Sequence, residues 1–147
     1  MANICLTFGT EARQDTLANA VRTLPGLAAW WTDGTSGDPD AGGKIAFRFG
    51  EAGGFDMRVK ESNDHSVVWE CTGGPDEWLG TGVEFKIQDE GTHRQLMFRH
   101  TDWEAETPFF HHCSMKWATF LLSLKAYVET GKGRPFPNDL KIEATGM

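Results

Sequence analysis

The sequence has no long hydrophobic run, and this absence sets the first limit on what the protein does. A transmembrane helix needs about 20 consecutive, mainly apolar residues, and no window of the sequence approaches that length. The N-terminal stretch also lacks the basic region and apolar core of a secretory leader. We therefore expect neither membrane insertion nor secretion.

Positive charge is scarce as well. The chain has 14 Lys and Arg residues against 21 Asp and Glu residues, which gives a formal net charge of −7. An acidic chain disfavours non-specific binding to nucleic acid or to anionic lipid surfaces, and it favours solubility. We expect no nucleic-acid partner.

Cysteine is the third scarce residue. Cys5, Cys71 and Cys113 are odd in number, widely spaced, and form no Cys-x-x-Cys pair. This usage is typical of free thiols in a reducing compartment and not of a disulfide framework. We expect a cytoplasmic protein.

The clearest pattern that is present is an apolar stripe near the C-terminus. Pro108 suits the first turn of a helix because its missing N–H would be unpaired there, and Gly131 can adopt the left-handed conformation that ends one. We predict one long helix over residues 109–130, about 33 Å in length, which needs a sheet to cover. Its apolar side chains recur at three- and four-residue steps, at Phe110, Cys113, Trp117, Phe120, Leu121, Leu124 and Val128.

The N-terminal part of the chain predicts a strand followed by two short helices. Alternating residues 4–8 indicate a half-buried strand, and Thr10 with the acidic residues after it signals a helix start. Pro25 is expected to break this first helix before a second one over residues 26–31. A loop rich in Gly, Asp, Pro and Ser follows over residues 32–43.

Alternation of apolar and polar residues dominates the middle of the chain. Five such strands joined by short turns predict hairpins, and hence an antiparallel sheet with one wet face and one packed face. Since 147 residues fit one domain, we predict a single α+β domain, residues 1–147. Its sheet of six or seven strands curves around the long C-terminal helix, with two short helices after the first strand. The tail after Pro135 shows no pattern that places it.

Strand parity also sorts the side chains of the sheet into two faces. The inner face is almost wholly apolar, and periodicity alone leaves open whether it fills a core or lines a cavity. The residues expected to face inward are Ile45, Phe47, Phe49, Phe55, Met57, Val59, Val67, Trp69, Cys71, Val83, Phe85, Ile87, Leu96, Phe98 and His100.

Four ordered motifs carry a resemblance to a known family. They are Trp-Trp-Thr at 30–32, P-x-x-W-L-G-T-x-V-x-F at 75–85, L-x-F-x-H-x-x-W at 96–103, and W-x-x-F-L-x-S-L-K-x-Y-x-E-x-G-x-G-x-P at 117–135. With these motifs the chain resembles the SRPBCC superfamily and, within it, the homologues of the activator of the heat-shock protein 90 ATPase. One departure is Asp102, which stands where the family usually has Gly before Trp103.

The resemblance implies a START-like, helix-grip fold, in which the long helix closes a cavity against the sheet. Such folds mostly hold apolar small molecules. We therefore expect a small hydrophobic ligand, aromatic or lipid-like, and no cofactor. The residues predicted to bind it are Trp31, Phe47, Met57, Trp69, Cys71, Phe85, Phe98, His100, Cys113, Trp117 and Phe120.

His100 is the sharpest single candidate for a polar contact in that cavity. A neutral imidazole on an apolar face must find a partner, which is either a ligand group or a backbone carbonyl. The inner face supplies no Asp or Glu to pair with His100, so no catalytic residue is predicted. A nucleophile–base pair of His100 with Cys71 or Cys113 remains a weaker option.

A metal site is not indicated. His111, His112 and Cys113 are consecutive on the predicted helix, so their side chains point about 100° apart and do not converge on one ion. His111 and His112 are instead expected to flank the apolar stripe as solvated residues.

Three function classes stay open at this point. The first is a non-catalytic binding or carrier protein, present as a monomer or homodimer. The second is a cyclase- or hydrolase-like enzyme that uses His100 in the same cavity. The third is a cochaperone-like stress-response interaction protein, which an apolar outer face would favour; Val68 and Met97 are the only notable apolar residues expected there.

Overall fold

The computed structural model describes residues 1–143 of the chain. Its elements follow the predicted order of strand, two helices, strands and long helix. They are β1 (Ala2–Thr10), α1 (Gln14–Arg22), α2 (Leu24–Trp30), β2 (Gly34–Gly37), β3 (Lys44–Arg48), η1 (Gly50–Ala52), β4 (Gly54–Ser62), β5 (Ser66–Gly73), η2 (Asp76–Trp78), β6 (Gly82–Asp89), β7 (Arg94–Trp103) and α3 (Pro108–Thr130).

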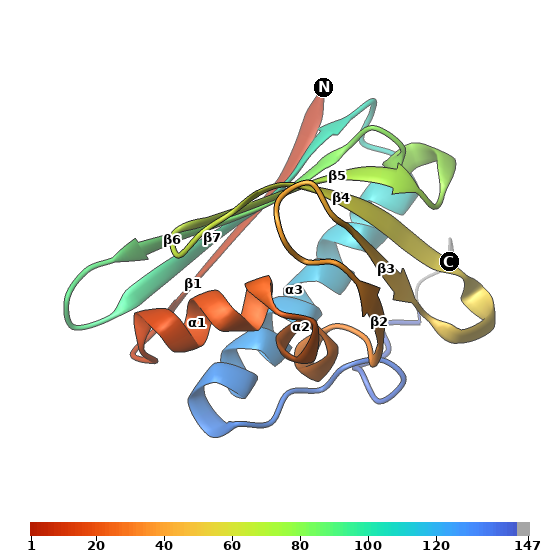
Figure 1. Ribbon diagram of the computed structural model, residues 1–147. Coiled ribbons are helices and arrows are strands. Elements are labelled where there is room, and N and C mark those ends of the chain that lie inside the picture. Colours follow the sequence, from red (N-terminus) through yellow and green to blue (C-terminus); the bar gives the residue numbers. More distant parts are fainter. Residues whose placement is uncertain (144–147) are drawn as a thin grey trace.

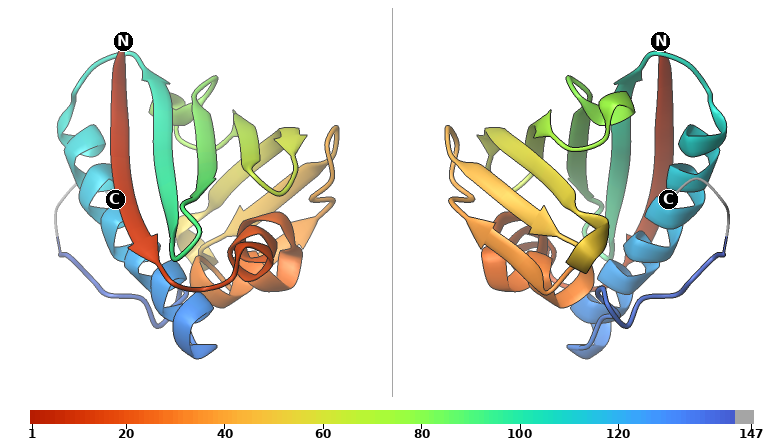
Figure 2. Two further views of the ribbon diagram at one scale, coloured as in Figure 1. Left: turned by 90° about the vertical axis from the view of Figure 1, so that its left-hand side faces the viewer. Right: turned by 90° about the vertical axis from the view of Figure 1, so that its right-hand side faces the viewer.

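The strands form one antiparallel sheet in the order β1-β7-β6-β5-β4-β3-β2. Figures 1 and 2 show that the sheet is curved and that α1, α2 and α3 all lie on the same side of it. The predicted α+β, helix-grip architecture is confirmed, with seven strands. Because β1 and β2 end the order, each leaves one strand edge unpaired within the sheet.

The prediction of a loop over residues 32–43 is wrong in part, because β2 lies inside that segment. Gly34–Gly37 pairs with β3 through backbone groups, and its small residues carry no apolar alternation that would reveal a strand. The first helix is also shorter than predicted. Thr10 ends β1, and Thr23 caps α2 by accepting a hydrogen bond from the Gly26 N–H, so Pro25 lies in the first turn of α2.

The long helix α3 ends where predicted, at Thr130, and begins one residue earlier, at Pro108. The Thr107 side chain accepts a hydrogen bond from the Phe110 N–H at 3.2 Å, Pro108 occupies the first turn, and Gly131 ends the helix at φ 85°. Ser123, which is buried on α3, donates a hydrogen bond to the Trp30 carbonyl at 2.9 Å. This hydrogen bond joins the C-terminal half of α3 to the last residue of α2.

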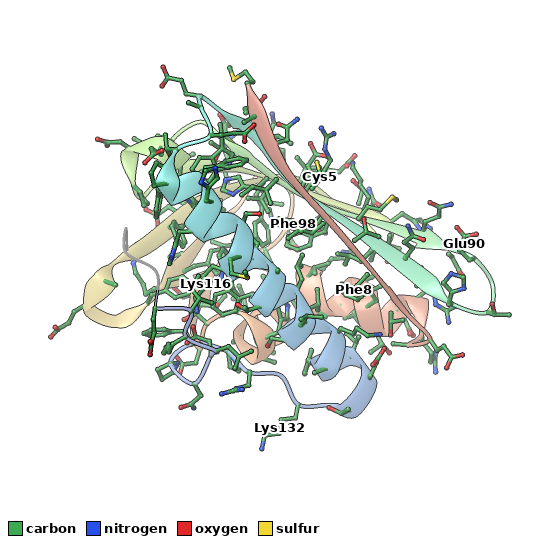
Figure 3. All side chains as sticks on the ribbon, turned by 180° about the vertical axis from the view of Figure 1, so that it is seen from behind. Cys5, Phe8, Glu90, Phe98, Lys116 and Lys132 are labelled. Atoms are coloured by element: carbon green, nitrogen blue, oxygen red, sulfur yellow. The ribbon has the colours of Figure 1, made fainter. Side chains whose placement is uncertain are left out.

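The inner face of the sheet is buried as strand parity predicts, with Phe49 only partly covered. Figure 3 shows Phe98 among the side chains between the sheet and α3. Asp102 adopts φ 69°, so the position where the family usually has Gly does have a left-handed backbone. The aspartate is held there by hydrogen bonds, since its N–H donates to the Asn3 side chain and its carboxylate accepts from Thr101.

The tail after α3, which the sequence left unplaced, returns to the body of the protein. The Phe136 N–H donates to the Trp31 carbonyl at 2.8 Å, and the Asp33 N–H donates to the Phe136 carbonyl at 3.3 Å. Phe136 also packs edge-on against Phe49. The last four residues, 144–147, lie outside the described part of the chain.

Across residues 1–143, no helix combines the length and the apolar character needed to cross a membrane.

Candidate functional site

A hollow of about 1140 Å³ opens beside the N-terminal half of α3, and we call it the aromatic groove. Its walls come from α3, from η1 and the start of β4, from η2, and from the tail. Its aromatic residues are Trp31, Phe49, Phe55, Trp78, Phe109, Trp117, Phe120 and Phe136. Its polar and thiol side chains are Glu77, Thr107, His112, Cys113, Lys116, Asp139, Lys141 and Glu143.

Stacked rings build the floor of the aromatic groove. The short helix η2 brings Trp78 flat onto Phe55, with ring centroids 3.8 Å apart and planes 9° apart. Trp78 also lies 6.0 Å from Trp117 at 20°, and Trp31 lies 4.9 Å from Trp117. Residues from four separate parts of the chain thus form one continuous apolar surface, which offset stacking stabilises.

Four of the residues predicted to bind a ligand line the aromatic groove: Trp31, Cys113, Trp117 and Phe120. The structure places the other seven elsewhere, in the packed core behind the groove. These are Phe47, Met57, Trp69, Cys71, Phe85, Phe98 and His100. The indoles of Trp31, Trp78 and Trp117 are buried and pack on one another, and the hollow lies beside them at the N-terminal half of α3.

His100 has partners for both ring nitrogens within the protein. The Trp117 indole N–H donates to Nδ1 at 3.1 Å, which assigns the proton to Nε2. Nε2 then donates to the Thr81 hydroxyl at 2.8 Å, and that hydroxyl donates to the Trp78 carbonyl at 2.6 Å. Burial lowers the pKa of His100 to about 3. His100 is thus a neutral residue that holds Trp117 and the η2 loop in position, with no nitrogen left for a ligand.

The two buried cysteines are unreactive in this setting. Burial raises the pKa of Cys71 to about 11 and that of Cys113 to about 12, so both thiols are protonated at neutral pH. Within residues 1–143, no group of three His, Cys, Asp or Glu side chains lies close enough together to hold a metal ion.

His112 contradicts the prediction that it is solvated. Its residue surface is only 7% exposed, it lines the aromatic groove, and its ring stacks on Phe109 with planes 9° apart. Neither Nδ1 nor Nε2 has a hydrogen-bond partner among the described residues. Burial lowers the pKa of His112, and the Lys116 ammonium lowers it further.

A sequence signal for His112 does exist. His112, Lys116 and Phe120 follow one another at four-residue steps, so they form a line along one edge of the apolar stripe. The same line marks the wall of the aromatic groove.

The tail forms the opposite wall through one buried carboxylate. Asp139 is 5% exposed and accepts hydrogen bonds from Lys116 and, at 2.7 Å, from Lys141. Burial acts to raise the pKa of Asp139, but the hydrogen bonds from Lys116 and Lys141 outweigh it and hold that pKa below its usual value. Lys116 also donates to the Leu140 carbonyl at 2.6 Å. In Figure 3, Lys116 lies on the side of α3 past which the tail runs.

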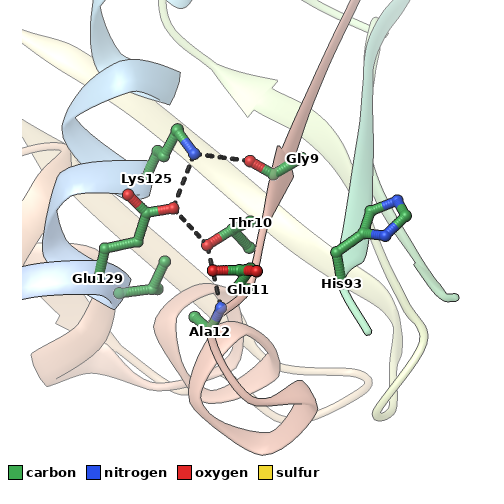
Figure 4. Close-up of a pocket in the computed structure, with 8 residues that line it drawn as sticks. Gly9, Thr10, Glu11, Ala12, His93, Lys125 and Glu129 are labelled. Atoms are coloured by element: carbon green, nitrogen blue, oxygen red, sulfur yellow. Dashed lines mark hydrogen bonds and ion pairs between the residues drawn. The ribbon is translucent and has the colours of Figure 1, made fainter. Parts of the chain in front are cut away.

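A second hollow, of about 630 Å³, lies between the end of β1 and the C-terminal half of α3 (Figure 4). Four of its lining residues pair with one another. Lys125 donates to the Gly9 carbonyl and to Glu129, both at 2.7 Å, and the Thr10 hydroxyl donates to Glu129 at 2.6 Å. These contacts clamp β1 to α3, and we assign this hollow a structural role.

Many solved structures are similar to this chain, including the following three. The Aha1 dimer from Colwellia psychrerythraea is 38% identical, with a TM-score of 0.83 over 90% of this chain and 100% of that one. CalU16 from Micromonospora echinospora is 17% identical, with a TM-score of 0.78 over 99% of this chain and 76% of that one. An HSP90 activator from Plasmodium falciparum is 17% identical, with a TM-score of 0.69 over 90% and 98%. The last two similarities concern the fold alone. No family model matches the chain, and neither does any curated protein.

Proposed function

Since this chain belongs to the family of homologues of the activator of the heat-shock protein 90 ATPase, with the SRPBCC helix-grip fold, we propose that it binds or carries a small hydrophobic molecule. The ligand is aromatic or lipid-like and occupies the aromatic groove, and the protein is not catalytic. The single observation that carries this proposal is the groove itself.

The composition and size of the aromatic groove support this function. Ligand sites are concave and mainly apolar, with a few placed polar groups, and typically measure about 300–1,000 Å³. At about 1140 Å³ the groove is slightly larger than that range, and eight aromatic side chains line it. The partly exposed rings among them, those of Phe49, Phe109 and Phe136, give a hydrophobic driving force for binding flat apolar molecules.

The chemistry of the buried groups supports a non-catalytic role. Both nitrogens of His100 are engaged, and both buried thiols are protonated at neutral pH. The enzyme alternative that relies on His100 therefore loses its general base. The three free thiols favour action in a reducing compartment such as the cytoplasm.

A specific observation favours self-association as a second property. The outer face of α3 exposes Met115 (57%) and Leu122 (61%), which are seven residues apart and so lie on the same side of the helix. Large apolar side chains exposed together mark association surfaces. The relative from Colwellia psychrerythraea is a dimer, and we propose that this chain forms a homodimer through the outer face of α3.

Titration with N-phenyl-1-naphthylamine, a neutral dye that fluoresces in apolar sites, tests ligand binding. Ala52 is exposed on η1 and lines the aromatic groove, so Ala52→Trp places an indole in the groove without changing the core. We expect saturable binding that weakens at least about tenfold in Ala52→Trp. Ala41→Trp, at an exposed turn outside the groove, is the matched control and should bind as the wild type does. No saturable binding, or equal binding by Ala52→Trp, overturns the proposal.

A further inference from the structure

His112 is the one side chain of the aromatic groove with two unpaired buried nitrogens among the described residues. It lies on the first turns of α3, one residue from Cys113 and four from Lys116. Phe109 stacks on one face of its ring, with centroids 6.2 Å apart. Lys116, the nearest charged group on α3, is already engaged by Asp139 and the Leu140 carbonyl, and it has no lone pair to offer.

An imidazole in this position lowers the stability of the empty protein. A buried polar group without a partner loses its hydrogen bonds to water and gains none in return. A phenylalanine would stack on Phe109 equally well and would carry no such cost. A hydrogen-bonding group from outside the chain would remove this cost.

The chemistry of a neutral imidazole narrows what that partner is. One ring nitrogen carries a proton and donates, while the other has a free lone pair and accepts. A hydroxyl group can pair with either nitrogen, because its oxygen accepts from the protonated one and its hydrogen is donated to the unprotonated one.

We propose that His112 is the polar anchor of the aromatic groove and that it selects flat, largely apolar ligands that carry a hydroxyl group. This inference rests on the proposed function, and it names the ligand class of the same site. The rings of the ligand stack on the aromatic floor, and its hydroxyl group pairs with the imidazole on the wall that α3 forms.

A pair of probes that differ by one hydroxyl group tests the assignment. Dissociation constants for 2-naphthol and naphthalene are measured by amide NMR titration in the wild type and in His112→Phe. In His112→Phe the preference for 2-naphthol over naphthalene, given by the ratio of the two dissociation constants, should fall about tenfold, because the selective hydrogen bond is lost. His111→Phe makes the same change at the exposed neighbouring position and should leave the ratio as in the wild type.

Two further readouts separate ligand recognition from a structural role. Removing an unpaired buried group should leave the melting temperature of His112→Phe at or above that of the wild type. In the wild-type protein, the imidazole ¹⁵N shifts of His112 should move with 2-naphthol and stay unchanged with naphthalene.

The outcomes divide cleanly between the two proposals. Suppose that N-phenyl-1-naphthylamine and naphthalene bind, but the ratio of the dissociation constants of 2-naphthol and naphthalene is the same in the wild type and in His112→Phe. The His112 assignment alone is then overturned. A clear fall in the melting temperature of His112→Phe also counts against it. If none of the three probes binds, the proposed function fails, and the assignment fails with it.

Discussion

At the scale of single residues, two buried histidines within one molecule have opposite hydrogen-bonding states. His100 has a partner for each ring nitrogen and positions Trp117, whereas His112 has none among the described residues. Burial is the chief cause that lowers the pKa of both imidazoles. The first arrangement stabilises the fold, and the second leaves hydrogen-bonding capacity for a ligand.

Burial of neutral histidine makes the stability of the protein depend on pH. The pKa of His100 falls from 6.5 to about 3 on folding, so below pH 6.5 the unfolded chain binds a proton that the folded protein excludes. Stability is therefore full above about pH 6.5 and falls as the pH decreases toward 3, by up to about 1.4 kcal/mol per pH unit from His100 alone. His112 acts in the same direction.

Urea unfolding at pH 7, 6 and 5 measures this dependence. Carboxylates with lowered pKa values, such as Glu129 and Asp139, lose their contribution only at lower pH, below their ordinary pKa values near 4. His100→Asn retains an acceptor for the Trp117 indole and should show a smaller slope over this range. A wild-type free energy of unfolding that stays constant from pH 7 to pH 5 would contradict the prediction.

At the scale of secondary-structure elements, α3 has two functions along its length. Its C-terminal half packs against α1, α2 and β1 through Leu121, Leu124 and Val128, while its N-terminal half presents His112, Lys116 and Phe120 to the groove. The tail lies across the N-terminal half, where the Asp139 carboxylate pairs with Lys116 and Lys141. One wall of the groove therefore depends on a short ionic contact.

Asp139→Asn tests the attachment of the tail. The change leaves Lys116 and Lys141 without their shared carboxylate, and losing a buried charged partner typically costs about 3 kcal/mol or more where both partners are buried. Because Lys141 is half exposed, we expect about 1–2 kcal/mol, faster amide hydrogen exchange in residues 135–143, and weaker N-phenyl-1-naphthylamine binding. Asp40→Asn, at an exposed loop position, is the control. Unchanged exchange in the tail would refute the ionic attachment.

The sequence predicts those elements whose side chains repeat with a regular period. The apolar stripe of α3 and the alternation in β3 to β7 place most of the fold, because burial of one face imposes that period. β2 and the tail carry no such pattern, since backbone hydrogen bonds and a single carboxylate hold them. For the same reason the candidate site is only partly predictable: Trp117 and Phe120 belong to the stripe, but Trp78 and Phe136 reach the groove from segments without periodicity.

At the scale of the whole molecule, the question is whether two copies associate. Leu122→Glu introduces a charge at the centre of the exposed face of α3 and should raise the dissociation constant of the proposed homodimer at least about tenfold. Sedimentation velocity over a range of protein concentrations measures that constant. Leu79→Glu, at a comparably exposed leucine in the loop after η2, should have no effect. A wild-type protein that stays monomeric at all concentrations rules out the dimer.

The stacked indoles of the aromatic groove have an optical consequence. Trp31 and Trp78 both lie within about 6 Å of Trp117, close enough for the electronic transitions of the rings to couple. Such coupling produces circular dichroism whose sign and size depend on the mutual orientation of the rings. A molecule that enters the groove and tilts any of the three indoles alters this spectrum, so the unlabelled protein reports its own occupancy.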